Sequence, residues 1–104
     1  MKAVLYTYRK ADPVVQFAED FPELNWAVSW SPEEVGEVID DADILLLTNR
    51  ICTPKLGEVI RRRAGDSLRW VHFVSAGIER GLEMGLPEKL LISTAAGTKA
   101  PVIS

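Results

Sequence analysis

The chain has 104 residues, enough for one globular domain with a single core, and its 47% hydrophobic and 26% charged content is ordinary for such a domain. Its net charge of −3 disfavours binding to nucleic acid or to anionic membrane, because basic surfaces bind phosphate groups. The single cysteine, Cys52, excludes an internal disulfide, and no segment approaches the ~18 apolar residues of a membrane span. We therefore expect a cytoplasmic protein with neither nucleic-acid nor membrane partners.

The first half of the chain alternates between apolar runs and helical patterns. In chain order these predict a strand at 3–8, a helix at 13–20, a strand at 24–30, a helix at 32–40 and a strand at 44–48. Asp12 and Ser31 each precede a proline and predict helix N-caps, and Glu34 completes a capping box with Ser31. The third strand is almost continuously apolar, which is typical of a strand that is covered on both faces.

The second half continues the alternation. It predicts a helix at 54–63, a buried strand at 68–74, a turn or one short helical piece at 79–85 and a brief strand at 90–93. Thr53 precedes a proline and predicts the N-cap of the helix at 54–63. Arginines 61–63 suit the C-terminal end of that helix and are expected on a solvated face, and Gly65 is the expected C-cap.

Strands that alternate with helices predict a parallel sheet with right-handed crossovers and helices on both faces. Five strands in a chain of this length favour a flavodoxin-like, three-layer α/β domain with the strand order 2-1-3-4-5. We assign residues 1–104 to this one domain.

The strand at 68–74 is followed by a corner of small residues, Ser75, Ala76 and Gly77. Small side chains let a ligand approach consecutive backbone N–H groups, and such a run of amides can form a concave nest for an anion such as a carboxylate. In an open α/β sheet, ligands bind at the carboxyl ends of the strands. The corner is therefore the first candidate for a binding site.

The second half also carries three motifs in a fixed order: LRWVHxxSAGI at 68–78, LP at 86–87 and ISTAAGxxAPxI at 92–103. Together they resemble the N-terminal, substrate-binding domain of the D-isomer-specific 2-hydroxyacid dehydrogenases. The resemblance covers about residues 43–104. The chain departs from the family pattern at Glu79, where an Asp is common, at Ser93-Thr94, where Thr-Asn is usual, and at Lys99, where a His is common.

The resemblance implies the reduction of small 2-oxo carboxylates and the oxidation of D-2-hydroxy carboxylates with NAD or NADP, by an enzyme that is usually a homo-oligomer. It implies that the corner at Ser75, with the amides of Ala76 and Gly77, holds the substrate carboxylate. It also implies that the loop after the third strand, with Thr48, Asn49 and Arg50, lines the same cleft. Gly97 and Thr98 would face the nicotinamide end of the cofactor.

The sequence contains no GxGxxG after a strand and therefore no dinucleotide fingerprint. The catalytic Arg, acidic residue and His of the family come later, in or just after the cofactor domain, and His72 lies in mid-strand. We therefore predict no catalytic residue, no metal site and no bound cofactor for this chain alone. We expect a substrate-binding domain that is truncated before its dinucleotide-binding domain, which is the partner it lacks.

Two alternatives use the same layout. A response-regulator receiver also has Ser-Ala after the fourth strand, but it needs acidic residues after the first and third strands to hold Mg²⁺. This chain has Arg9-Lys10 and Thr48-Asn49-Arg50 at those places, which disfavours a receiver. A stand-alone binding or self-association module without catalysis is the second alternative.

Overall fold

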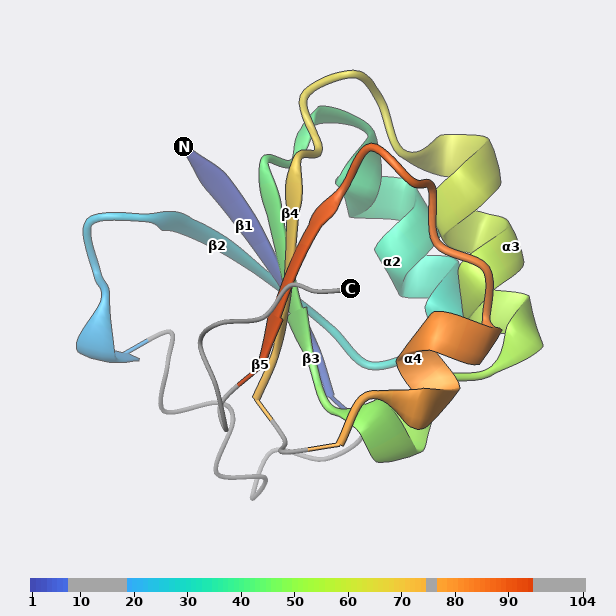
Figure 1. Cartoon of the computed structure of the whole chain (residues 1–104). Helices are drawn as coiled ribbons and strands as arrows, with labels where there is room; N and C mark the ends of the chain where they lie inside the picture. The colour runs from blue at the N-terminus through green and yellow to red at the C-terminus, as the bar shows by residue number, and fades with distance from the viewer. Residues whose placement is uncertain (8–18, 75–76, 95–104) are drawn as a thin grey trace.

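A computed structural model describes residues 1–7, 19–74 and 77–94 of the chain. All five strands run parallel in one sheet, in the order β2-β1-β3-β4-β5 (Figure 1). They are β1 (Lys2–Tyr6), β2 (Asn25–Ser29), β3 (Ile44–Leu47), β4 (Trp70–Phe73) and β5 (Leu91–Thr94). The α/β class and the predicted strand order are therefore confirmed.

Three described helices pack on one side of the sheet, as Figure 1 shows. They are α2 (Pro32–Val38), α3 (Pro54–Arg63) and α4 (Glu79–Glu83), and two short 3₁₀ turns, η2 (Ile39–Asp41) and η3 (Asn49–Ile51), lie beside them. The prediction for 54–63 is confirmed to the residue, and α4 is the short helical piece expected at 79–85. Of the helix predicted at 13–20, only Glu19 and Asp20 lie within the described residues, and both are helical.

The helix starts follow the predicted capping chemistry. The hydroxyl of Ser31 accepts a hydrogen bond from the Glu34 amide at 3.2 Å, and that of Thr53 accepts from the Leu56 amide at 3.2 Å. The Glu34 carboxylate reaches back to the amide of Trp30, at 2.6 Å, which is one residue before the cap. Helix α2 ends two residues earlier than predicted because its last turn tightens into η2, where the Ala42 amide bonds to the Ile39 carbonyl.

One prediction at the end of α3 is wrong and one is confirmed. The C-cap is Ala64, and no left-handed conformation occurs at Gly65; the space beside Gly65 is taken instead by the carbonyl oxygen of Asp40. Arginines 61–63 are exposed, as predicted. The Arg61 guanidinium also donates to the carbonyls of Met84 and Gly85 at 2.7 Å and 2.8 Å, which was not predicted. That guanidinium satisfies carbonyls at the end of α4, which a helix leaves without internal partners.

Side chains are buried on both faces of the sheet, as a three-layer arrangement requires. All four residues of β3 are buried, and so is most of β1. The helix-bearing face contributes Val4, Leu45, Leu47, Val71 and Phe73 to a core that α2, η2 and α3 complete with Val35, Ile39, Leu56 and Ile60. The opposite face carries a smaller cluster formed by Ala3, Leu5, Ile44 and Leu46. Within the described residues, no helix has the length and apolar character needed to cross a membrane.

Helices α3 and α4 approach so closely that one position on α3 has no room for a side chain. A methyl group built on Gly57 overlaps the carbonyl of Met84, which is backbone and has little freedom to move aside. At Gly36 on α2, by contrast, the methyl group meets only side chains: a Val59 carbon at 3.1 Å and Arg63 atoms at 3.6 Å and 4.0 Å.

We predict that Gly57→Ala lowers the free energy of unfolding by about 3 kcal/mol, because overpacking at a backbone contact outweighs the gain in helix propensity. Gly36→Ala, which brings the same gain in propensity, serves as the matched control and should change stability by less than about 1 kcal/mol. Urea unfolding followed by circular dichroism measures both. Equal midpoints for the two variants would contradict the close approach of α3 and α4.

Candidate functional site

The carboxyl ends of parallel strands meet at one edge of the sheet, and in this fold that edge contains a switch point. The chain leaves β1 toward β2, on one side, and leaves β3 toward β4, on the other. Ligands of open α/β sheets bind in the crevice outside such a point, because the two connections separate there. A site is therefore expected at the carboxyl ends of β1 and β3.

Two threonines, Thr7 and Thr48, lie just past the ends of β1 and β3 at this point. The register pairs Leu5 with Leu46, and continuing it by two residues places Thr7 opposite Thr48. Thr7 is fully buried, and the hydroxyl oxygens of both threonines are buried without a hydrogen-bond partner among the described residues. Buried hydroxyls almost always have partners, so this pair calls for an explanation.

The segment after β3 forms η3, which includes Asn49 and the exposed Arg50, both predicted to line the cleft. Helix α4 is attached to it, because the guanidinium of Arg80 donates to the carbonyl of Arg50 at 3.2 Å. Arg80 therefore brings a second cation to this edge. Arg80 was not predicted to lie at this edge, because the local sequence pattern of α4 does not indicate a contact with a residue 30 positions away.

The predicted corner follows β4, whose end is paired through a bond from the Val74 amide to the Leu47 carbonyl at 2.9 Å. Ser75 and Ala76 lie outside the described residues, whereas Gly77 is described and half-buried. The carboxylate of Glu79 lies against Gly77: a methyl group built there would be 3.0 Å and 3.1 Å from its two oxygens. A negative charge thus already stands beside the corner that was predicted to bind one.

The structure brings three of the predicted binding residues, Asn49, Arg50 and Gly77, to the same edge of the sheet. The two residues predicted to face a cofactor, Gly97 and Thr98, lie outside the described residues. Thr7 was missed because it belongs to the apolar run that predicts the first strand. The position of Thr7 next to the end of β3 follows from the strand order, which local sequence patterns do not give.

Cys52 lies close to the same edge but is poorly suited to nucleophilic chemistry. Its thiol is buried and rests 3.5 Å from the Thr48 carbonyl. Burial raises the pKa of this thiol to about 11, although the nearby charge of Arg80 acts in the opposite direction. Almost none of this thiol is thiolate at neutral pH, and the thiolate is the nucleophilic form. Burial likewise raises the pKa of Tyr6 at the end of β1.

A second polar cluster lies on the face of the sheet opposite the helices. The hydroxyl oxygen of Ser93 is 2.7 Å from Trp70 Nε1 and 2.7 Å from His72 Nδ1. Trp70 Nε1 donates to the Ser93 hydroxyl, which can donate to His72 Nδ1 or accept from it, according to the tautomer of the imidazole. Trp70 and His72 border a groove of about 340 Å³ whose other walls are apolar: Met1, Phe21, Leu24, Trp26, Ile44 and Leu46. His72 is therefore a half-buried residue that bonds to Ser93 at the side of this groove.

No group of three or more His, Cys, Asp or Glu side chains within the described ranges is placed to hold a metal ion. Comparisons of the chain with protein-family models, curated proteins and solved structures found no match. The resemblance to 2-hydroxyacid dehydrogenases therefore rests on the sequence motifs alone. The geometry at the carboxyl edge of the sheet is a separate observation that does not depend on those motifs.

We predict that stability falls as the pH is lowered through about 6.5, the ordinary pKa of histidine. Burial lowers the pKa of His72, the single histidine of the chain, so the folded state favours its neutral form. The unfolded chain takes up the proton first, and the stability that is present above pH 6.5 is lost as the pH falls. His72→Gln should flatten this dependence between pH 7.5 and 5.5, measured by thermal unfolding in matched buffers. An unchanged slope would contradict the assignment.

Proposed function

We propose that the domain binds a small 2-oxo or 2-hydroxy carboxylate at the carboxyl edge of its sheet, between the ends of β1, β3 and β4. The observation that carries the proposal is the pair of buried hydroxyls, Thr7 and Thr48, that have no partner among the described residues at the switch point. Hydroxyl groups donate to carboxylate oxygens, and the guanidinium groups of Arg50 and Arg80 belong to elements at the same edge.

Without a ligand, these two buried hydroxyl groups should lower the stability of the fold. A buried hydroxyl that lacks a partner costs about 1 kcal/mol or more, whereas valine has nearly the same shape and no such cost. A sheet that needed only packing at these two positions would be more stable with valine. Threonine becomes favourable at these two positions if a ligand forms hydrogen bonds with the hydroxyl groups.

We propose further that this is the substrate-binding domain of an NAD(P)-dependent oxidoreductase acting on D-2-hydroxy acids, of the glyoxylate/hydroxypyruvate reductase or phosphoglycerate dehydrogenase type. The motifs at 68–103 support this proposal, and the strand order agrees with it. The residues described here would bind and orient the carboxylate. NAD or NADP, and the catalytic Arg, acidic residue and His, would belong to a dinucleotide-binding domain.

A stand-alone binding or self-association module remains the second candidate, favoured by the opposed charge of helices α2 and α3. Ligand preference separates the two roles. A dehydrogenase domain should prefer pyruvate to propionate, which lacks the 2-oxo group, whereas a general carboxylate site should bind both alike.

We predict that pyruvate shifts amide resonances at the ends of β1 and β3 in an NMR titration, and that pyruvamide, its uncharged analogue, does not. Thr48→Val should weaken pyruvate binding about tenfold, since a hydrogen bond to a charged group contributes roughly 1.5 kcal/mol. Thr48→Ser keeps the hydroxyl group and should therefore retain the affinity of the unaltered chain for pyruvate.

The same valine variant has a second readout that misfolding would not mimic. Thr48→Val should raise the free energy of unfolding by about 1 kcal/mol, because it removes a buried hydroxyl that has no partner among the described residues. A variant that loses both binding and stability, or one that keeps full binding, would contradict the proposed site.

We predict that Glu79→Gln strengthens pyruvate binding, because it removes a negative charge beside Gly77 while keeping the shape of the side chain. The effect should diminish in 0.5 M salt, which screens exposed charges. Glu88→Gln, at an exposed position in the loop before β5, is the matched control and should leave the dissociation constant unchanged. Equal affinities for the Glu79 variant and the unaltered chain would mean that the ligand binds away from the corner.

A further inference from the structure

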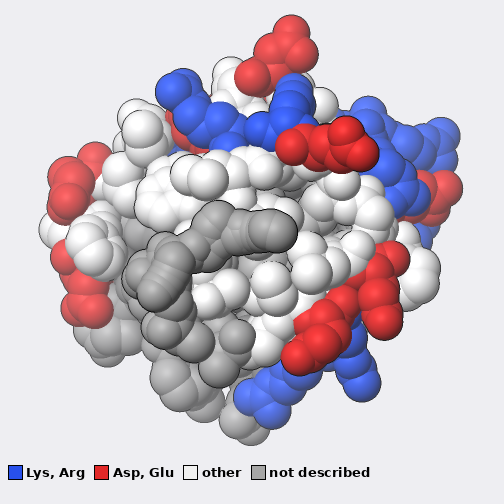
Figure 2. Space-filling model, viewed as in Figure 1, with Lys and Arg blue, Asp and Glu red and all other residues white. Residues whose placement is uncertain are grey.

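Two neighbouring helices on the outer layer carry opposite charge. Residues 32–41, which form α2 and η2, contain five acidic residues and no basic one. Helix α3 contains one lysine, three arginines and a single acidic residue, Glu58. Figure 2 shows Lys and Arg side chains gathered at the upper right, where α3 ends in Figure 1. The chain as a whole has a net charge of only −3, so this separation of charge is local.

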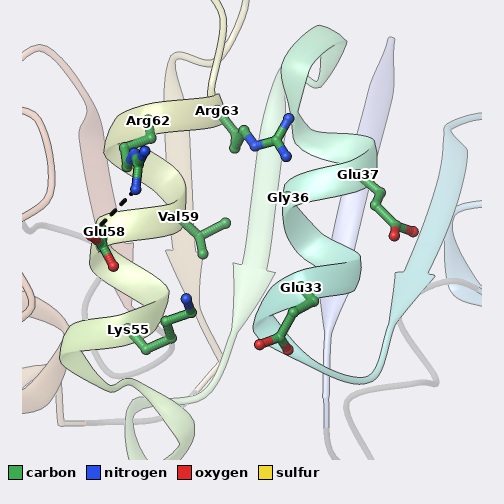
Figure 3. A pocket seen from close by; sticks show the side chains of 8 residues that line it. All are labelled: Glu33, Gly36, Glu37, Lys55, Glu58, Val59, Arg62 and Arg63. Carbon is green, nitrogen blue, oxygen red and sulfur yellow. Dashed lines mark ion pairs between the residues drawn. The ribbon is translucent and has the colours of Figure 1, made fainter.

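The two helices border a groove of about 570 Å³, with acidic side chains on one wall and mainly basic ones on the other (Figure 3). Glu33 and Glu37 come from α2, and Lys55, Arg62 and Arg63 from α3. Glu58 bonds to Arg62 at 3.5 Å within α3. No ion pair within the described residues joins the acidic wall to the basic wall, so Glu33, Glu37, Lys55 and Arg63 keep their charges available.

The floor of the groove is narrow and uncharged. Gly36 packs against Val59, since a methyl group built on the glycine would be 3.1 Å from a Val59 side-chain carbon. Helices α2 and α3 run in the same direction, because each returns from the carboxyl end of one parallel strand to the start of another. Glu33 and Lys55 lie near one end of the groove, and Glu37 and Arg63 lie toward the other (Figure 3).

We propose that this surface binds a second copy of the chain about a two-fold axis parallel to α2 and α3. Such an axis places α2 of one copy on α3 of the other without shifting it along the helix. Acidic residues of α2 then face basic residues of α3 at the same position along the helix axis. The contact occurs twice, once for each copy, as an isologous interface requires. A two-fold axis across the helices would instead set α2 on α2 and acid on acid. Charge thus selects both the occupant and its orientation.

The interface should be weak and salt-dependent. Exposed ion pairs contribute little one at a time, and salt screens them once the Debye length falls to a few ångströms. We expect the association constant to fall about tenfold or more between 50 mM and 500 mM NaCl. Sedimentation equilibrium over a concentration series measures it. This inference does not depend on carboxylate binding, and either can fail without the other.

Charge reversal provides the decisive test. E33K/E37K makes both walls basic, and K55E/R63E makes both walls largely acidic, so each variant alone should be monomeric. An equimolar mixture restores opposite charges on both facing pairs and should form a one-to-one dimer. E23K/E88K changes the charge by the same amount as E33K/E37K at exposed positions outside the groove and should self-associate like the unaltered chain.

Circular dichroism and thermal unfolding of each variant establish that it is folded. A dimer of the unaltered chain that both reversals abolish and their mixture restores would support the proposal. A chain that stays monomeric at low salt, a dimer that the reversals leave intact, or a mixture that associates no better than its components would overturn it.

Discussion

The pairing of β1 with β3 is the constraint on which the rest of the structure depends. These two strands are almost wholly buried, so their register cannot slip by one residue without turning apolar side chains toward water. The same pairing brings the ends of β1 and β3, followed by Thr7 and Thr48, to one edge of the sheet, where the chain departs in two directions. The core and the candidate site therefore share one cause. A substitution that loosened this pairing would disturb both together.

Much of the fold was accessible from the sequence because its signals are local. Capping residues such as Ser31 and Thr53 act within one turn, and the apolar run of β3 marks a strand covered on both faces. The features at the end of α3 that the sequence did not predict involve contacts between distant parts of the chain. Gly65 proved to be small because the Asp40 carbonyl lies beside it, and Arg61 is held by carbonyls more than 20 residues away. No periodicity or capping rule contains that information.

The candidate site shows the same division. The location of Arg50 and Gly77 at this edge could be predicted. Both lie in the segments that follow strands, and the carboxyl ends of parallel strands share one edge of the sheet. The location of Thr7 could not be predicted, because a threonine at the end of an apolar run reads as part of a strand. Glu79 was noted in the sequence only as a departure from a family pattern. In the structure, the Glu79 carboxylate lies beside Gly77 and places a negative charge at the corner that is proposed to bind a carboxylate.

The close contacts of α4 limit where the chain can change in length. Gly57 leaves room for the carbonyl of Met84, and Arg61 binds that carbonyl together with the next one. An insertion or deletion at 84–85 would break both contacts at once, whereas a longer loop farther along, near 88–89, would meet neither. Among divergent relatives, we therefore expect residues 57 and 61 to covary with the spacing between α4 and β5.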